Sequence, residues 1–258
     1  MTSCGSGCKD VYTVRSCSHC RVPATNRQWL WGFRYFQHNQ NDQARVQVAN
    51  YSGKKMTSLS HIKVLDLTSH LSGPYCAMIL ADHGADVVKI ENPNGGDQLR
   101  KTPPFQDGES APFMLWNRNK RSVVMDLKNA EDHKTILKMI EVADVLIENF
   151  KPGTAKRLGI DYEAVSEINS KLIYCSISGF GQTGPYSPRG GFDLIACGMS
   201  GLMSINGPPE GPPYRIPMPV SDVCGGMNGA IGILMALVAR DKTGVGQHVD
   251  TSLFEAGI

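Results

Sequence analysis

The segment Ile62-Lys-Val-Leu-Asp-Leu67 decides the fold, because it has the length and the apolar, β-branched composition of a buried strand. Ser72-Gly-Pro74 then opens a helix, since proline suits the first turn of a helix. Asp86-Val-Val-Lys-Ile-Glu91 is predicted as a second strand. A strand, a helix and another strand in this order are typical of a βαβ unit, in which the two strands are parallel.

The same alternation continues towards the C-terminus. A helix with Ile136, Ile140 and Ala143 on one face is predicted between two later strands. Further strands are predicted over residues 122–126, 145–147, 172–176 and 247–252. This pattern predicts a doubly wound, Rossmann-like α/β domain, in which ligands bind beyond the carboxyl ends of the parallel strands. The loops at that edge are residues 68–74, 92–96, 149–153 and 179–185.

One predicted helix, Val223–Arg240, contains Gly225, Gly226, Gly229 and Gly232. Each glycine costs a helix about 1 kcal/mol relative to alanine. So many glycines in one helix predict that another backbone packs very close to it.

The first turn of the domain excludes a nicotinamide-binding site. Such a site needs a Gly-x-Gly-x-x-Gly turn, whose glycines let the backbone approach a pyrophosphate. The turn over residues 69–74 contains only Gly73.

Composition excludes further classes. The 258 residues are 41% hydrophobic, which suffices for one large core. The formal charge of +2 gives no reason to expect a nucleic acid or an anionic membrane as partner. No apolar run approaches about 18 residues, so no membrane-spanning segment is predicted.

Residues 1–55 differ from the rest, with eight basic residues, two acidic residues and little periodicity. Three interpretations are open: a mitochondrial presequence, a zinc site, or a disordered extension, the last of which we favour. The predicted domains are therefore a leader or disordered extension over 1–55 and the folded domain over 56–258. The side chains available to zinc would be Cys4, Cys8, Cys17, Cys20 and His19.

The other four cysteines are scattered through apolar surroundings, where a thiol behaves as a small hydrophobe. This pattern favours a reducing compartment over a disulfide framework. We expect the cytoplasm or, if the leader is a presequence, the mitochondrial matrix. The four are Cys76, Cys175, Cys197 and Cys224.

From Ile62 onwards, six segments in order resemble the class III CoA-transferase family. The family includes formyl-CoA transferase, carnitine CoA-transferase, succinyl-CoA:glutarate CoA-transferase and alpha-methylacyl-CoA racemase. The segments are Val64-Leu-Asp-Leu-Thr68 with Gly73-Pro74, Gly84-Ala-Asp-Val-Val-Lys-Ile-Glu91, Asn117-Arg-Asn-Lys-Arg-Ser122, Ala143-Asp-Val-Leu-Ile-Glu-Asn-Phe-Lys-Pro-Gly153, Gly179-Phe-Gly-Gln-Thr-Gly-Pro185 and Lys242-Thr-Gly-Val-Gly-Gln247.

The resemblance implies the large domain of an enzyme that forms an interlocked homodimer, with the family's C-terminal part missing from this sequence. It implies an acyl-CoA and a carboxylic acid acceptor as partners, CoA as a substrate, and no metal or other cofactor. By position it places CoA contacts on His70, Leu71, Ser72, Asn92, Met125, Lys128, Asn149, Phe150, Lys151, Arg157, Leu158 and Asp193.

The chemistry of these residue types suits CoA. Lys128, Lys151 and Arg157 would give charge-assisted hydrogen bonds to its phosphates. Leu71 and Phe150, with Met125, would line an apolar slot for adenine.

Two aspartates are candidates for the catalytic group. Asp193 precedes an apolar helical run and is expected to be the N-cap of that helix. Asp222 precedes the glycine-rich helix, and the resemblance aligns it with the transferase nucleophile. The oxyanions need N–H donors, which are expected either from the backbone near Gly225 and Gly226 or from a glycine-rich loop that the family has in the part missing from this sequence.

The predicted reaction is CoA transfer through an aspartyl mixed anhydride and an aspartyl-CoA thioester. One alternative is an alpha-methylacyl-CoA racemase, but Phe192 stands 30 positions before Asp222, where the racemases have a histidine. The other alternative is a non-catalytic CoA-binding fragment.

Overall fold

The computed structural model describes residues 48–49 and 55–258, and every structural statement below concerns that part of the chain. The described residues all fall within one compact unit, and the predicted division of the chain at residue 56 stays a prediction. The three interpretations of residues 1–55, including the zinc site at Cys4, Cys8, Cys17, Cys20 and His19, lie almost entirely outside the described residues.

The centre of the unit is a six-stranded sheet in the order β10-β9-β8-β3-β4-β7, in which every neighbouring pair is parallel. Its strands lie within a few residues of the six predicted ones, so the predicted α/β class with a doubly wound parallel sheet is confirmed. The strands are β3 (Lys63–Asp66), β4 (Asp86–Glu91), β7 (Arg121–Val124), β8 (Val145–Glu148), β9 (Ile173–Ser178) and β10 (His248–Ser252).

The chain winds outward twice from the middle of this sheet. It runs from β3 through β4 to β7, returns to β8 beside β3, and continues through β9 to β10. Strand order therefore reverses between β3 and β8, and the carboxyl ends of these two strands form the topological switch point, where doubly wound folds bind ligands.

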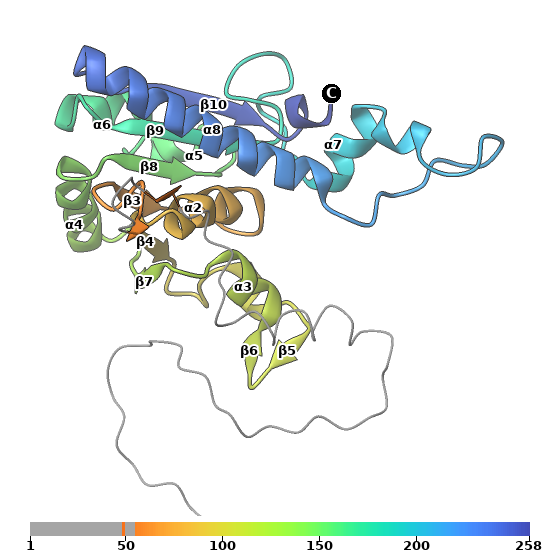
Figure 1. Cartoon of the computed structure of the whole chain (residues 1–258), viewed down its shortest axis with the longest axis horizontal. Helices are drawn as coiled ribbons and strands as arrows, with labels where there is room; N and C mark the ends of the chain where they lie inside the picture. Colours follow the sequence, from red (N-terminus) through yellow and green to blue (C-terminus); the bar gives the residue numbers. More distant parts are fainter. Residues whose placement is uncertain (1–47, 50–54) are drawn as a thin grey trace, which may run out of the picture. The chain divides into compact units, whose positions relative to one another are not determined.

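Helices cover both faces of the sheet and enclose a separate apolar core on each side. Helices α2 (Ser72–Asp82) and α8 (Val220–Thr243) pack on one face. Figure 1 shows α8 running along β9 and β10. Helices α4 (Ala130–Glu141), α5 (Thr154–Arg157) and α6 (Tyr162–Ile168) pack on the other face.

Local chemistry sets the ends of these helices. Asn129 Oδ1 accepts hydrogen bonds from Glu131 N and Asp132 N at 2.9 and 3.2 Å, which caps α4. Helix α8 ends at Gly244, whose φ of 73° suits a residue without a side chain.

Several short elements were not predicted, because two to seven residues carry too little periodicity to be recognised. They are β1 (Val48–Ala49), β2 (Lys55–Met56), β5 (Phe105–Gln106), β6 (Glu109–Ser110), α3 (Ala111–Trp116), α5, α6 and the 3₁₀ turns η1 (Gln98–Lys101), η2 (Leu202–Ile205) and η3 (Glu255–Gly257). Helix α7 (Asp193–Met199) corresponds to the apolar helical run predicted after Asp193.

The glycines of α8 have the predicted packing role. A Cβ on Gly226 would lie 2.5 Å from Ser72 O, the backbone at the start of α2. A Cβ on Gly229 would lie 3.2 Å from Cys76 Sγ, and one on Gly232 would lie 2.6 Å from Val249 Cγ1. The predicted close backbone approach is confirmed, and its partner is α2.

Helix α8 is also long and apolar enough to cross a membrane by length and composition alone, the only helix among the described residues to meet that test. Packing against α2, β9 and β10 explains why the residues on one side of α8 are apolar. The absence of a membrane-spanning segment stays a prediction.

We expect Gly226→Ala to lower the free energy of unfolding by about 2–3 kcal/mol, because the added methyl meets backbone, which cannot move aside cheaply. Gly198→Ala in α7 is the matched control, since its Cβ meets nothing closer than Met203 Sδ at 3.7 Å. That substitution should stabilise the protein by about 0.5–1 kcal/mol. Urea unfolding measures both, and equal effects would contradict the packing role of Gly226.

Candidate active site

Four charged side chains lie buried at the carboxyl ends of β3 and β4: Asp66, Lys89, Asp97 and Lys120, each at most 2% exposed. We call them the buried ion cluster. Lys89 Nζ lies 2.9 Å from Asp97 Oδ2, and Lys120 Nζ lies 2.8 Å from Asp66 Oδ2. Burial raises the pKa of Asp66, but the two lysines outweigh burial and hold that pKa below its usual value. The cluster therefore pairs two lysines with two aspartates.

The buried ion cluster fixes the turn between β3 and α2, residues 67–71. Lys89 Nζ donates a hydrogen bond to Thr68 O at 2.7 Å. Asp97 Oδ1 accepts one from His70 N at 3.1 Å. His70 has a φ of 65°, which is uncommon for a residue other than glycine, so these bonds stabilise an unusual backbone conformation.

Asn149 joins this turn to the one that follows β8. Its Oδ1 accepts a hydrogen bond from Ser69 N at 2.9 Å, and its Nδ2 donates one to Ser69 O at 2.7 Å. The two turns at the switch point are thus held together by a single amide side chain.

The structure brings the residues predicted to bind CoA, apart from Asp193 on α7, to one edge of the sheet. They follow β3, β4, β7 and β8, whose carboxyl ends are neighbours, or lie in and just after α5. The contacts with CoA stay a prediction. Exposed members are His70, Asn92, Lys128, Lys151 and Arg157; partly buried ones are Leu71, Met125, Asn149, Phe150 and Leu158; Ser72 is buried.

Some of these side chains also hold the local structure. The Asn149 side chain is hydrogen-bonded to Ser69. Asn92 Nδ2 donates a hydrogen bond to Gly96 O at 3.0 Å within its own turn. Arg157 donates one hydrogen bond to Thr154 Oγ1 at 2.8 Å. The exposed cations therefore have more capacity for a phosphate than the two asparagines do.

Asp222 lies in the first turn of α8, opposite the start of α2. The close approach of Gly226 to Ser72 O brings the two helices together there. Burial and the neighbouring Asp193 raise the pKa of Asp222 to about 6, although a hydrogen bond from Ser72 partly offsets them. The result is a partly buried carboxylate that is ionised at neutral pH and more basic than an ordinary aspartate.

Asp193 does not cap its own helix as predicted. It is the first residue of α7, which has Phe192 at its N-cap position and no side-chain cap bond. Its Oδ1 instead accepts hydrogen bonds from Ser221 N at 2.9 Å and Asp222 N at 3.4 Å. The carboxylate therefore caps α8, and its expected contact with CoA stays a prediction.

The expected oxyanion donors need correction. Gly225 and Gly226 are the sixth and seventh residues of α8 (Val220–Thr243). Only the first four N–H groups of a helix lack an intrahelical acceptor. Their N–H groups are thus expected to be engaged inside the helix.

The position expected for a racemase histidine holds an exposed phenylalanine. Phe192 is 64% exposed, and its ring lies edge-on to the His70 ring, with centroids 6.4 Å apart. A phenyl ring cannot transfer a proton, so no second base is present at this position.

The sequence patterns did not identify Lys89 and Glu148, two buried residues that support the backbone of the candidate site. Lys89 and Glu148 each interrupt or end an apolar strand, which was the available signal. Burial raises the pKa of Glu148 to about 7, and its Oε2 accepts a hydrogen bond from Phe150 N at 2.7 Å. Among the described residues, no group of three or more His, Cys, Asp or Glu side chains could hold a metal ion.

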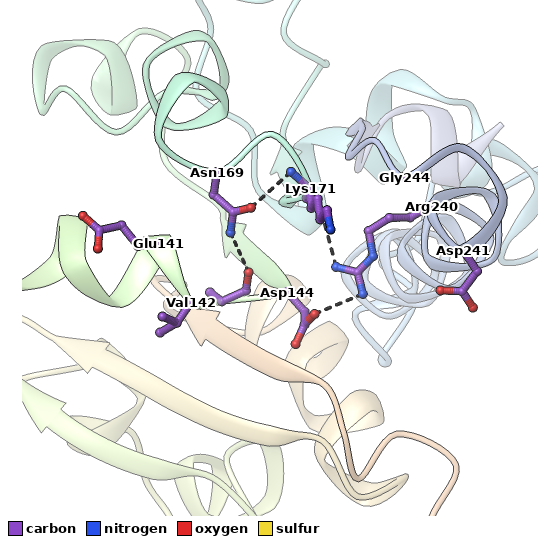
Figure 2. Close-up of a pocket in the computed structure, with 9 residues that line it drawn as sticks. Glu141, Val142, Asp144, Asn169, Lys171, Arg240, Asp241 and Gly244 are labelled. Atoms are coloured by element: carbon purple, nitrogen blue, oxygen red, sulfur yellow. Dashed lines mark hydrogen bonds and ion pairs between the residues drawn. The ribbon is translucent and has the colours of Figure 1, made fainter.

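An open cavity of about 500 Å³ lies at the amino-terminal edge of the sheet, away from Asp222 (Figure 2). Arg240 NH2 pairs with Asp144 Oδ1 at 3.0 Å, and Arg240 NH1 donates to Lys171 O at 3.3 Å. These contacts fasten the end of α8 to the starts of β8 and β9. The cavity therefore lies where the end of α8 contacts the sheet, and it is separate from the candidate active site.

Comparisons with known proteins agree on one family. A model of CoA-transferase family III matches residues 59–258. The chain is 46% identical over 204 residues to a succinate–glutarate CoA-transferase of Agrobacterium fabrum, covering 76% of this chain and 51% of that protein. It is 41% identical over 201 residues to succinyl-CoA:glutarate CoA-transferase of Homo sapiens, covering 78% and 46%.

A solved structure is similar over the same part. The crystal structure of a CaiB/BaiF family protein from Brucella suis matches with a TM-score of 0.76 and 41% identity, covering 79% of this chain and 55% of that one. The chain spans about half the length of these relatives.

We expect Asp222→Asn to stabilise the protein at alkaline pH. The pKa of Asp222 in the folded state, about 6, lies above its ordinary value of 3.8, so ionisation of this group opposes folding. This destabilisation is absent below about pH 4, develops as the pH rises to about 6, and is complete above it. Asp222→Asn should therefore add on the order of 2–3 kcal/mol at pH 8 and little at pH 4. Thermal unfolding at both pH values tests this, with the exposed Asp241→Asn on the same helix as control; equal effects at the two pH values would contradict it.

Proposed function

The chain belongs to CoA-transferase family III, and from this premise we propose that it transfers CoA from an acyl-CoA to a carboxylic acid, with Asp222 as the nucleophile. The observation that supports the proposal most is the state of that carboxylate. It has a pKa of about 6, so it is ionised at neutral pH while keeping the basicity that favours attack on a carbonyl.

The proposed reaction begins with attack of Asp222 on the thioester carbonyl of the donor. The carbon–sulfur bond breaks, CoA leaves as a thiolate, and an acyl–aspartyl mixed anhydride remains. The thiolate then attacks the aspartyl carbonyl of this anhydride, which releases the donor acid and leaves an aspartyl-CoA thioester.

The second half repeats this chemistry with the acceptor. The acceptor carboxylate attacks the aspartyl thioester and expels the CoA thiolate, which gives a second mixed anhydride. The thiolate attacks the acceptor carbonyl of that anhydride, which forms the product thioester and regenerates Asp222. No net electron transfer occurs, so the proposal requires no redox cofactor.

The turns at the switch point are suited to hold CoA in this scheme. Lys128, Lys151 and Arg157 offer exposed cations at the same edge for the phosphates. The racemase alternative is weaker, because it needs a second acid–base group where Phe192 stands.

Dicarboxylic acids are the acceptors to test first. Relatives carry the names succinate–glutarate CoA-transferase and succinyl-CoA:mesaconate CoA-transferase, the latter at 46% identity. Succinyl-CoA with glutarate or mesaconate is the corresponding starting pair. The four thiols outside residues 1–55 are unpaired, which fits a reducing compartment such as the cytoplasm or the mitochondrial matrix.

We expect Asp222→Asn and Asp222→Ala to abolish CoA transfer and to leave CoA affinity nearly unchanged, because both variants lack the attacking oxygen. The purified protein is incubated with succinyl-CoA, quenched with hydroxylamine and digested, and the hydroxamate is located by peptide mass. The label should fall on Asp222, and Asp241→Asn should behave like the wild type.

Other outcomes identify the alternatives. Label on another residue would overturn the proposed nucleophile. CoA binding with no label would favour the CoA-binding fragment, and exchange of the α-hydrogen of a 2-methylacyl-CoA for solvent deuterium would favour the racemase.

We also propose that the protein is a homodimer and that a second copy covers the outer side of α8. Five apolar side chains form an exposed stripe there, on the side of the helix opposite its buried glycines. Contiguous exposed apolar surface is typical of interaction sites. The stripe consists of Met227, Ile231, Leu234, Met235 and Val238.

We expect Val238→Lys to shift the protein from dimer to monomer, because it places a charge in this stripe. Val124→Lys is the matched control, since both valines are 62% exposed and Val124 lies on β7. Light scattering after size exclusion measures the mass. A monomeric wild-type protein, or equal effects of the two substitutions, would contradict the proposal.

A further inference from the structure

Asp193, on α7, links that helix to the first turn of α8, which contains the candidate nucleophile Asp222. It is 8% exposed, and its Oδ1 accepts the Ser221 N–H at 2.9 Å and the Asp222 N–H at 3.4 Å. Cys197 Sγ, one turn further along α7, adds a weaker contact at 3.8 Å. The first turn of α8 is therefore capped by a side chain that lies 28 residues before Ser221 in the sequence.

This arrangement replaces the usual cap of α8. The N-cap position is Pro219, which has no side chain able to accept a hydrogen bond, and no local cap bond is present. The N–H groups of the first turn need acceptors, and a helix N-terminus favours a negative charge. A carboxylate from α7 supplies both, and at the same time it fixes the backbone of the nucleophile.

Asp193 also places a second negative charge next to Asp222. The elements packed against this end of α8 are α2, α7 and η3, with His70 in the turn before α2. Of their titratable side chains, Asp193 is the one whose charge acts on Asp222. The other titratable side chains on these elements are Tyr75, Cys76, Asp82, Cys197 and Glu255.

We propose that Asp193 is a positioning residue for the nucleophile: it fixes the backbone of Asp222 by capping α8 from a neighbouring helix, and it holds a second carboxylate beside that of Asp222. The inference rests on the proposed role of Asp222 as the nucleophile. It assigns Asp193 a role in tuning that group and not in binding CoA.

The cap and the charge can be separated by substitution. Asparagine at position 193 keeps an oxygen that accepts the Ser221 N–H but carries no charge. Serine is a second neutral residue that accepts a hydrogen bond from a helix N-terminus. A purely structural role would be preserved in these variants, whereas a role of the charge would be lost.

The test measures the titration midpoint of the Asp222 carboxyl directly, so it does not require an active enzyme. The full chain is labelled with ¹³C at the aspartate carboxyl carbons, and its NMR spectrum is followed from pH 3 to pH 9, with Asp222→Asn to assign the resonance. The wild-type midpoint is expected near 6. In Asp193→Asn it should fall towards 3.8 without reaching it, because burial, the larger cause, remains. Asp241→Asn, which removes a charge from the far end of α8, should leave the midpoint unchanged.

Each outcome decides the inference. An unchanged midpoint in Asp193→Asn and Asp193→Ser would overturn it, even in an active transferase. Unfolding of both neutral variants, detected by circular dichroism, would overturn the part that concerns charge, since the role would then be structural. A lowered midpoint in a protein that shows no acyl transfer would support the tuning by Asp193 and count against the proposed function instead.

Discussion

The buried ion cluster of Asp66, Lys89, Asp97 and Lys120 is the constraint on which the candidate active site depends. The four buried charged side chains depend on one another, because removal of one partner from a buried ion pair costs about 3–5 kcal/mol. Two further hydrogen bonds from the cluster go to the backbone of Thr68 and His70. It thereby fixes the turn at the switch point in a conformation that the local sequence does not favour.

The second constraint is the contact between α8 and α2. Glycine at position 226 lets α8 meet the backbone of Ser72, so the first turn of α8 lies against the start of α2. This contact places Asp222 between the switch-point turn and α7, in surroundings that raise the pKa of its carboxyl. The glycines lower the helix propensity of α8. In return they allow the close packing that holds the Asp222 carboxylate in a partly buried site, which is suited to nucleophilic chemistry.

Several polar residues near the site hold the local backbone in place. Asn149 ties two turns together, Asp193 caps a neighbouring helix, and Glu148 accepts the N–H of Phe150. Such residues are often interpreted as ligand contacts when a family motif is read position by position. In this protein their side chains bind the backbone of Ser69, Phe150, Ser221 and Asp222.

The sequence by itself determined the six strands, the long glycine-rich helix, the doubly wound class, the family and the edge of the sheet that carries the candidate site. These depend on patterns within a few residues: apolar runs, the proline that opens α2, and short motifs in order. Tertiary structure alone decided that Lys89 meets Asp97, that Asn149 holds Ser69 across 80 residues, and that Asp193 caps α8 and not its own helix. A polar side chain can satisfy its hydrogen bonds with many partners, and which one it meets depends on strand order and helix packing, which no local pattern specifies.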